Sequence, residues 1–462
     1  MNPNGTALPL IDRIRSRALI VGLVGAALSL VGAMTDRAHF DRAYLSSFIF
    51  VLGLSLGSMA LLLIHRQLGG AWGFLVRRPL ESAAMTMPLV AVLFIPVLID
   101  LEHIYPWVNH HSEEKNSSGS EGDNPLGGAP ARPTALPTSD KPEDKGSPVK
   151  VISEGNTSGG AGGVTAGSRG VRRDPLEKDT ADLLGFKNIW LTPTNFTIRA
   201  AIYFALWIVI AAILNIGSRR QDETKSASLA YGLQSFSAPA LVVYFLSTSL
   251  ALVDWGMSLE PEWYSSLYGV MLIIGQGISA VALMILVAAI IAGRGETNGL
   301  DTRETFNDLG NLLLAFTMLW GYLSFSQFLI IWSGNLSEEI PWYARRLTGG
   351  WQNFGRFLML FHFAVPFLVL LARPLKRNIN ALWKVAALVL VAHLVNDYWL
   401  IAPSFGEKPT PFLSSFSWLD LVVPTGMIGL WFSAFLWQLR GKPLLVVQDP
   451  ELLPALKQAG GH

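Results

Sequence analysis

Several ionisable side chains lie inside long apolar stretches of the chain. His393 and Asp397 are four residues apart in one such stretch, and His362 lies in the stretch before it. If these stretches are helices, the spacing of His393 and Asp397 places both side chains on one face. An ionisable group costs several kcal/mol inside a bilayer unless it is paired or hydrated, so each one is a candidate functional group. Imidazoles and buried carboxyls suit proton transfer, because modest shifts bring their pKa values near physiological pH.

The candidate proton-transfer residues share an expected position in the outer half of a membrane: Asp254, Tyr322, Gln327, His362, His393, Asp397 and Asp420. Three interpretations of this set are open. The first is a chain of protonatable groups, hydroxyls and water that carries protons. The second is bis-histidine haem ligation by His362 and His393. The third is structural, with polar groups that hydrogen-bond between helices and fix their packing. The gathering of several such groups in one membrane half favours proton transfer for the set.

The elements that must position these residues are apolar segments, and a transmembrane helix needs roughly 20 mostly apolar residues. Such runs cover residues 18–34, 44–64, 83–101, 197–216, 238–259, 268–292, 309–333, 354–371, 381–401 and 419–439. The composition agrees, since 51% of the 462 residues are hydrophobic and only 15% are charged, whereas soluble proteins carry about 25% charged residues. The chain is therefore predicted to be an all-α integral membrane protein with about ten transmembrane helices.

The loops between these segments predict the orientation and the division of the chain. Lysine and arginine gather in the short loops of one side, which predicts that this side and both termini are cytoplasmic. Residues 1–109 then hold the first three transmembrane helices, and residues 181–440 hold an interfacial helix over 181–196 and seven more. Residues 441–462 form a cytoplasmic tail. Residues 110–180 are rich in Gly, Pro and Ser and predict a disordered extracytoplasmic insert. The alternative for this insert is an arm that orders on a neighbouring subunit.

Cysteine content and net charge exclude several kinds of function. The chain contains no cysteine, which excludes cysteine-ligated iron–sulfur clusters and thioether-attached haem within it. Its formal net charge is +1, so bulk positive charge gives no case for nucleic-acid binding. If the protein takes part in redox chemistry, most of the electron carriers are expected in other subunits.

Tryptophans are unusually frequent near the predicted extracytoplasmic boundary. An aromatic belt at the headgroup level is one explanation, and a docking surface for an extracytoplasmic partner is the other. The residues predicted to dock a partner lie in two neighbouring outer loops and at the adjoining helix ends: Glu260, Glu262, Trp263, Trp332, Trp342, Arg345, Arg346 and Trp351.

Several motifs in the second half of the chain resemble those of one family. They are DW at 254–255, EPEWYSS at 260–266, NDLGNLL at 307–313, IIWSGNL at 330–336, EEIPWY at 338–343 and FHF at 361–363. On these residues the chain resembles a polysulfide-reductase-type membrane subunit of bacterial alternative complex III, a quinol:cytochrome c oxidoreductase. That complex has two related subunits of this type, and the chain is similar to the one that is not usually credited with the quinol pocket. The first three predicted helices match the family only in hydropathy.

The resemblance implies a fold of two four-helix bundles plus two peripheral helices, in the bacterial inner (cytoplasmic) membrane. It implies a subunit without cofactors, in a respiratory or photosynthetic complex, with a role in proton transfer. The implied partners are a related quinol-binding membrane subunit, an extracytoplasmic iron–sulfur protein and a multihaem cytochrome c. Haem c, iron–sulfur clusters and quinol are then expected in those partners. The family motifs support Asp254 and His362 better than the other candidates.

Two alternatives stay open for the function. One is direct quinol binding by this chain, through His362 or His393 with a carboxylate as proton acceptor. The other is an unrelated secondary transporter, although such folds usually have discontinuous helices and substrate sites at the midplane.

Overall fold

Long apolar helices make up the structure. The computed structural model describes residues 8–108, 187, 189–224, 226–293, 302–405 and 416–440. Over these residues the chain forms helices and no strands, and ten helical stretches are long and apolar enough to cross a membrane. The prediction of an all-α integral membrane protein with ten transmembrane helices is confirmed. The expected insert at 110–180 and the expected tail at 441–462 lie outside the described residues.

Eight of the ten spans are built on one continuous helix each: α1 (Leu8–Thr35), α2 (Arg37–Leu68), α9 (Pro193–Thr224), α10 (Ala227–Trp255), α11 (Tyr268–Ala292), α12 (Thr302–Gly334), α17 (Ile379–Ile401) and α19 (Leu419–Leu439). Short helices flank them: η1 (Met257–Leu259), α13 (Ile340–Leu347), α16 (Arg373–Arg377) and η3 (Ala402–Ser404). The expected interfacial helix over 181–196 lies partly outside the described residues. Within them, Ile189 and Trp190 form a turn, and α9 begins at Pro193.

The two remaining spans are interrupted. The third consists of α3 (Ala71–Ala84), α4 (Met87–Leu93) and α5 (Ile95–Ile99), and α6 (Leu101–Ile104) follows it. Both α4 and α5 have a proline in their first turn. A proline is tolerated there because the N–H groups of the first turn have no hydrogen-bond partner within the helix. The eighth span consists of α14 (Trp351–Phe357), the π-helical segment η2 (Leu358–Ala364) and α15 (Val365–Leu371).

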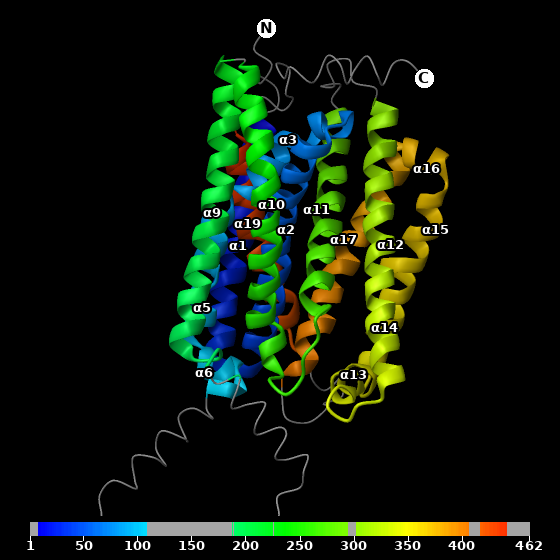
Figure 1. The fold of residues 1–462 in the computed structure, drawn as a ribbon. Helices are drawn as coiled ribbons and strands as arrows, with labels where there is room; N and C mark the ends of the chain where they lie inside the picture. The colour runs from blue at the N-terminus through cyan, green and yellow to red at the C-terminus, as the bar shows by residue number, and fades with distance from the viewer. Residues whose placement is uncertain are drawn as a thin grey trace, which may run out of the picture.

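The helices form two bundles around α2 and α11. The first bundle comprises α2, α3–α5, α9 and α10, and the second comprises α11, α12, α14–α15 and α17 (Figure 1). Helix α11 packs on both α2 and α17, which joins the bundles, while α1 and α19 pack on each other and on α2. As a result, 94% of the most apolar stretch of α2 is buried inside the protein. The predicted two four-helix bundles with two peripheral helices are present.

Both described ends of the chain lie at one side of the bundles. Arg440, directly after α19, lies 3.3 Å from the carboxylate of Asp12 in the first turns of α1, and we call this side of the bundles the terminal face. Helices α6 and α13 lie at the opposite side (Figure 1), which we call the loop face. This placement agrees with an even number of spans.

Glycines allow α1 and α19 to approach closely. A Cβ atom added to Gly25 would lie 2.4 Å from the Cα of Gly426, and one added to Gly22 would lie 2.6 Å from the backbone nitrogen of Leu430. Small residues at such a crossing allow the two backbones to touch, which is how helices gain packing energy in lipid. The pair therefore depends on glycine at these positions.

Replacing Gly25 by valine should separate α1 from α19, because the new side chain meets backbone rather than a flexible side chain. Overpacking of this kind costs ~1–3 kcal/mol. We expect a lower thermal unfolding midpoint for the purified protein in detergent, followed by tryptophan fluorescence. Gly232→Val is the matched control, since a Cβ at Gly232 would meet nothing within 4 Å. Equal midpoints for the two variants would contradict the packing role.

Candidate functional site

Two histidines from different helices meet inside the second bundle. His362 comes from η2 and His393 from α17, and their rings stack with centroids 5.4 Å apart and an interplanar angle of 21°. The two residues are 0% and 2% exposed. Gly275 of α11 leaves room for this pair, because a Cβ there would lie 2.4 Å from Cε1 of His393. The structure thus brings together two residues that the sequence placed only at similar depth.

The π-helical turn at His362 has a local cause in the sequence. Pro366 lies four residues after His362 and has no N–H to donate to its carbonyl, so the regular helix ladder is broken there. The chain widens into the π-helical segment over Leu358–Ala364. Single π-turns inside α-helices are frequent at functional sites. Here the segment carries His362 on its buried side.

A buried carboxyl extends the histidine pair. Asp397 lies one turn beyond His393 on α17, with its Oδ2 3.6 Å from Nε2 of His393. Asn396 donates from Nδ2 to Oδ1 of Asp397 at 3.3 Å. On the other side, the ring of Trp320 meets that of His362 edge-on with centroids 4.3 Å apart. His362, His393 and Asp397 form a continuous array, which we call the histidine array.

Several buried polar atoms of the second bundle have no hydrogen-bond partner among the described residues. They include both ring nitrogens of His362, Nδ1 of His393 and both amide atoms of Gln327. Gln327 is only 2% exposed. Buried polar atoms in native proteins are nearly always satisfied, often by ordered water. These side chains therefore do not form a closed hydrogen-bond network among themselves, and an ordered water would satisfy each unpaired atom.

The haem interpretation does not fit the geometry of the two histidines. A bis-histidine haem needs one imidazole on each side of the macrocycle, with both ring edges directed at the iron. The rings of His362 and His393 instead stack face to face at 5.4 Å, which leaves no space for a porphyrin. The same two residues with Asp397 give no metal-binding group either, since no cluster of three His, Asp or Glu side chains suited to a metal occurs in the described part of the chain.

Asp254 lies apart from the histidine array, in the first bundle. Its carboxylate pairs with Arg199 of α9 through two bonds of 2.8 and 3.0 Å. Trp190 donates to it at 2.7 Å and Tyr203 at 3.1 Å. Four donated bonds, two of them from the guanidinium, hold this carboxylate between α9 and α10. Asp254 is therefore part of a hydrogen-bonded ion pair between α9 and α10, and its role in proton transfer stays a prediction.

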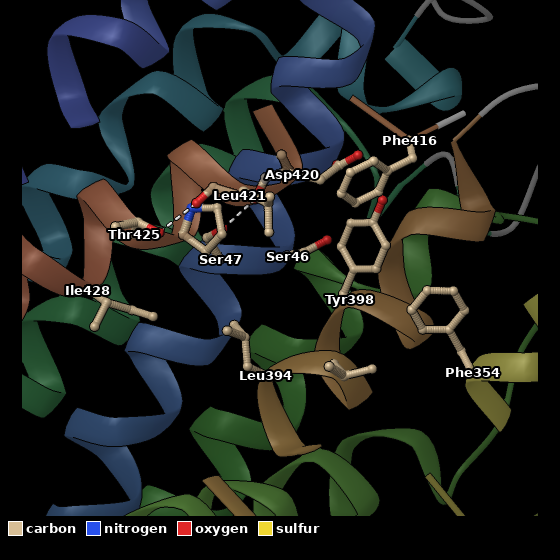
Figure 2. A pocket seen from close by; sticks show the side chains of 13 residues that line it. Ser46, Ser47, Phe354, Leu394, Tyr398, Phe416, Asp420, Leu421, Thr425 and Ile428 are labelled. Carbon is tan, nitrogen blue, oxygen red and sulfur yellow. Dashed lines mark hydrogen bonds between the residues drawn. The ribbon is translucent and has the colours of Figure 1, made fainter. Parts of the chain in front are cut away.

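Asp420 is also paired, at the start of α19. It accepts a bond of 2.8 Å from Arg42 of α2 and another of 2.9 Å from the backbone N–H of Ser417. Beside this pair lies a pocket of about 300 Å³ between α2, α17 and α19. Figure 2 shows Ser46 and Ser47 on one wall of this pocket, with Tyr398 across from them. The pair holds the loop-face ends of α2 and α19 together.

Tyr322 does not belong to the buried polar set. Its side chain is 66% exposed on α12, whereas Gln327 of the same helix is buried. The two residues are five positions apart, and five positions along an α-helix lead to opposite faces. The sequence prediction grouped them by depth alone, and the structure corrects that grouping.

The predicted docking residues are mostly internal, which corrects their assignment as an exposed surface. Arg346 is 0% exposed, and its guanidinium binds Glu260 at 3.1 Å and the Ser404 hydroxyl at 2.7 Å. Burial lowers the pKa of Arg346 from its ordinary value, while the Glu260 carboxylate opposes that shift. Arg345 lies 4.0 Å from the same carboxylate. These contacts close the loop face between η1, α13 and η3.

Of the four predicted docking tryptophans, three are buried and one is exposed. Trp263 and Trp342 stack on each other with centroids 4.6 Å apart, and they are 3% and 2% exposed. Trp351 is buried as well, while Trp332 is 72% exposed. Together with the exposed Glu262, Trp332 is what remains of the predicted docking surface.

Three important residues were missed from the sequence. Arg199 and Arg42 neutralise Asp254 and Asp420, and Asn396 contacts Asp397. A signal for Arg199 was present, since it is a charged residue inside the expected span 197–216 and such residues require a partner. Hydropathy alone gives no sign of which acidic residue that partner is.

Breaking the Arg199–Asp254 pair should destabilise the protein. Arg199→Gln leaves the buried Asp254 carboxylate without its cation, which costs ~3–5 kcal/mol for buried pairs. The double variant Arg199→Gln with Asp254→Asn should recover part of this loss, because no charge is then unpaired. Arg373→Gln is the control, since its side chain is 67% exposed and exposed pairs contribute ~0–1 kcal/mol. Thermal unfolding in detergent measures all three, and a double variant no more stable than Arg199→Gln would contradict the pairing argument.

Comparisons with known proteins add no assignment to this geometry. A scan against protein-family models finds no match for the chain, and a search of curated proteins finds none either. The family resemblance drawn from the motifs therefore stays a prediction. The structure itself supports an all-α membrane protein with ten spanning helices, whose second bundle holds a buried histidine array.

Proposed function

We propose that this chain is an integral membrane subunit of a respiratory or photosynthetic quinol:electron-acceptor oxidoreductase, without cofactors of its own, and that it provides part of a proton-transfer pathway. The observation that carries the proposal is the histidine array. His362 and His393 are buried in contact with each other, and Asp397 follows within 3.6 Å. Three nitrogens of the two rings lack partners among the described residues. Buried titratable groups that can still exchange hydrogen bonds with water are what proton relays require.

The ion pairs narrow the proposed pathway. Asp254 and Asp420 are bound by arginines, so the pathway runs through His362, His393 and Asp397 instead. Gln327 is the additional buried group whose amide is available for a water molecule. In this proposal the loop face is extracytoplasmic, and the array delivers protons toward that side.

The partners in the proposal follow the family resemblance. They are a related quinol-binding membrane subunit, an extracytoplasmic iron–sulfur protein and a multihaem cytochrome c, which hold the quinol, clusters and haems. Exposed Glu262 and Trp332 at the loop face are the residues proposed to contact the extracytoplasmic partners. Both termini are proposed to be cytoplasmic, in a bacterial inner membrane.

The two alternatives have less support. Direct quinol binding through His362 or His393 requires a pocket at those rings, and neither ring lines the pockets of about 300, 210 and 760 Å³ that the described residues form. A secondary transporter usually interrupts corresponding helices in its two halves. The interrupted spans here are α3–α5, which is the second span of the first bundle, and α14–α15, which is the third span of the second bundle. These two positions do not correspond.

Asp397→Asn should slow proton release by the intact complex. The asparagine keeps the size of the side chain and removes its ability to carry a proton, so we expect at least a ~10-fold loss in proton release rate at unchanged haem content. The measurement is the rate of proton release in proteoliposomes, followed with a pH-sensitive dye. His393→Asn should give the same result.

Tyr322→Phe is the matched control, because it removes a hydroxyl that lies on the exposed face of the same bundle. It should leave proton release unchanged. Asp397→Asn and His393→Asn complexes that assemble fully and release protons at the normal rate would exclude the relay.

A further inference from the structure

A long groove runs along the outside of the second bundle. It has a volume of about 760 Å³ and lies between α12, α13, the α14–α15 span and α17. Its walls are largely aromatic, including Trp320, Phe325, Phe328, Phe363 and Phe367. The rim is exposed, with Met359 at 71% and Tyr322 at 66%. The groove is therefore open sideways, toward the surroundings of the bundle.

The groove is elongated along the eighth span. On the eighth span its lining extends from Gln352 to Phe367, which is ~22 Å at ~1.5 Å per residue. The eighth span runs from Trp351 to Leu371. The groove thus begins beside α13, at the end of the span nearest the headgroups, and extends along most of its length. An elongated apolar chain fits this shape, whereas a compact solute leaves most of the groove unfilled.

The headgroup end of the groove is cationic. Arg356 lines the groove there and is exposed, with one bond of 3.0 Å to Asn353 of the same turn. Gln352 and the Tyr343 ring lie at the same end. An arginine is well suited to a phosphate, which its guanidinium binds with two parallel bonds. A cation at headgroup depth above an aromatic groove complements a molecule with a phosphate and an acyl chain.

We propose that this groove binds one phospholipid of the loop-face leaflet, with its phosphate at Arg356 and an acyl chain along the aromatic wall. The proposal is independent of the proton-transfer function. It has a consequence for the histidine array, since two groove residues touch that array. Trp320 contacts His362, and Asn396 contacts Asp397. A bound acyl chain closes this side of the array to water from the bilayer surface.

One glycine allows the groove to be filled without disturbing the fold. Gly355 lines the groove, and a Cβ added to it would meet only Cζ2 of Trp399, at 3.8 Å. Gly355→Leu therefore places a side chain in the groove, and Gly355→Ala is the matched control that leaves it open. Gly321 is unsuitable for this purpose, because a Cβ there would lie 2.3 Å from Phe363.

The test uses the full-length protein in vesicles of phosphatidylglycerol with a trace of a phosphatidylglycerol that carries a diazirine in one acyl chain. After illumination, labelled peptides are mapped. We expect labelling concentrated in residues 318–328 and 352–367, at least about five-fold lower in Gly355→Leu and unchanged in Gly355→Ala. A diazirine diacylglycerol without phosphate should label the groove several-fold less, and Arg356→Gln should remove that difference.

Thermal unfolding of each variant shows that loss of labelling is not loss of fold. Labelling spread evenly over the exposed faces of α1, α9 and α12 would mean that only bulk lipid touches the protein and would overturn the proposal. So would undiminished groove labelling in folded Gly355→Leu. A further outcome is that a diazirine quinone labels the groove and that excess phosphatidylglycerol fails to lower this labelling. This result would assign the groove to another ligand and would also overturn the proposal.

Discussion

A polar group inside a bilayer must find its partners within the protein, and this constraint divides the buried side chains into two kinds. Carboxylates near both faces are paired with arginines. Asp254 binds Arg199 at the loop face, and Glu81 binds Arg78 at 2.7 Å near the terminal face. These pairs fix the positions of the helices, because separating the partners leaves an unpaired charge in the apolar interior. The histidine array is of the second kind, since three of its four ring nitrogens have no partner among the described residues.

The two bundles share an architecture and differ in what fills them. Aromatic rings occupy the interior of the first bundle, where Trp255 packs against Phe94 at 4.4 Å and against Trp207 at 5.8 Å. The interior of the second bundle holds His362 and His393. The first bundle thus combines aromatic packing with ion pairs toward its ends, whereas the second holds buried ring nitrogens that lack partners among the described residues.

Hydropathy predicted the spans well because length and apolarity are what the bilayer demands. It also placed His393 and Asp397 on one helix face, since that follows from spacing alone. It did not predict which way Tyr322 points or that Arg346 is buried. Membrane helices are apolar on all sides, so periodicity does not mark the inner face as it does in soluble proteins. The pairing of Arg199 with Asp254 depends on contacts 55 positions apart in sequence, which no local pattern encodes.

The glycine contact between α1 and α19 has a consequence for biosynthesis. The first helix of the described chain meets the last one, and both cover α2. During translation, α1 must therefore remain in the membrane without its partner until every other helix has been inserted. Throughout that interval its glycine stripe and one side of α2 face lipid or an insertion factor. Assembly of this fold is thus completed only by the last helix, and a chain halted before residue 419 leaves its most central helix uncovered.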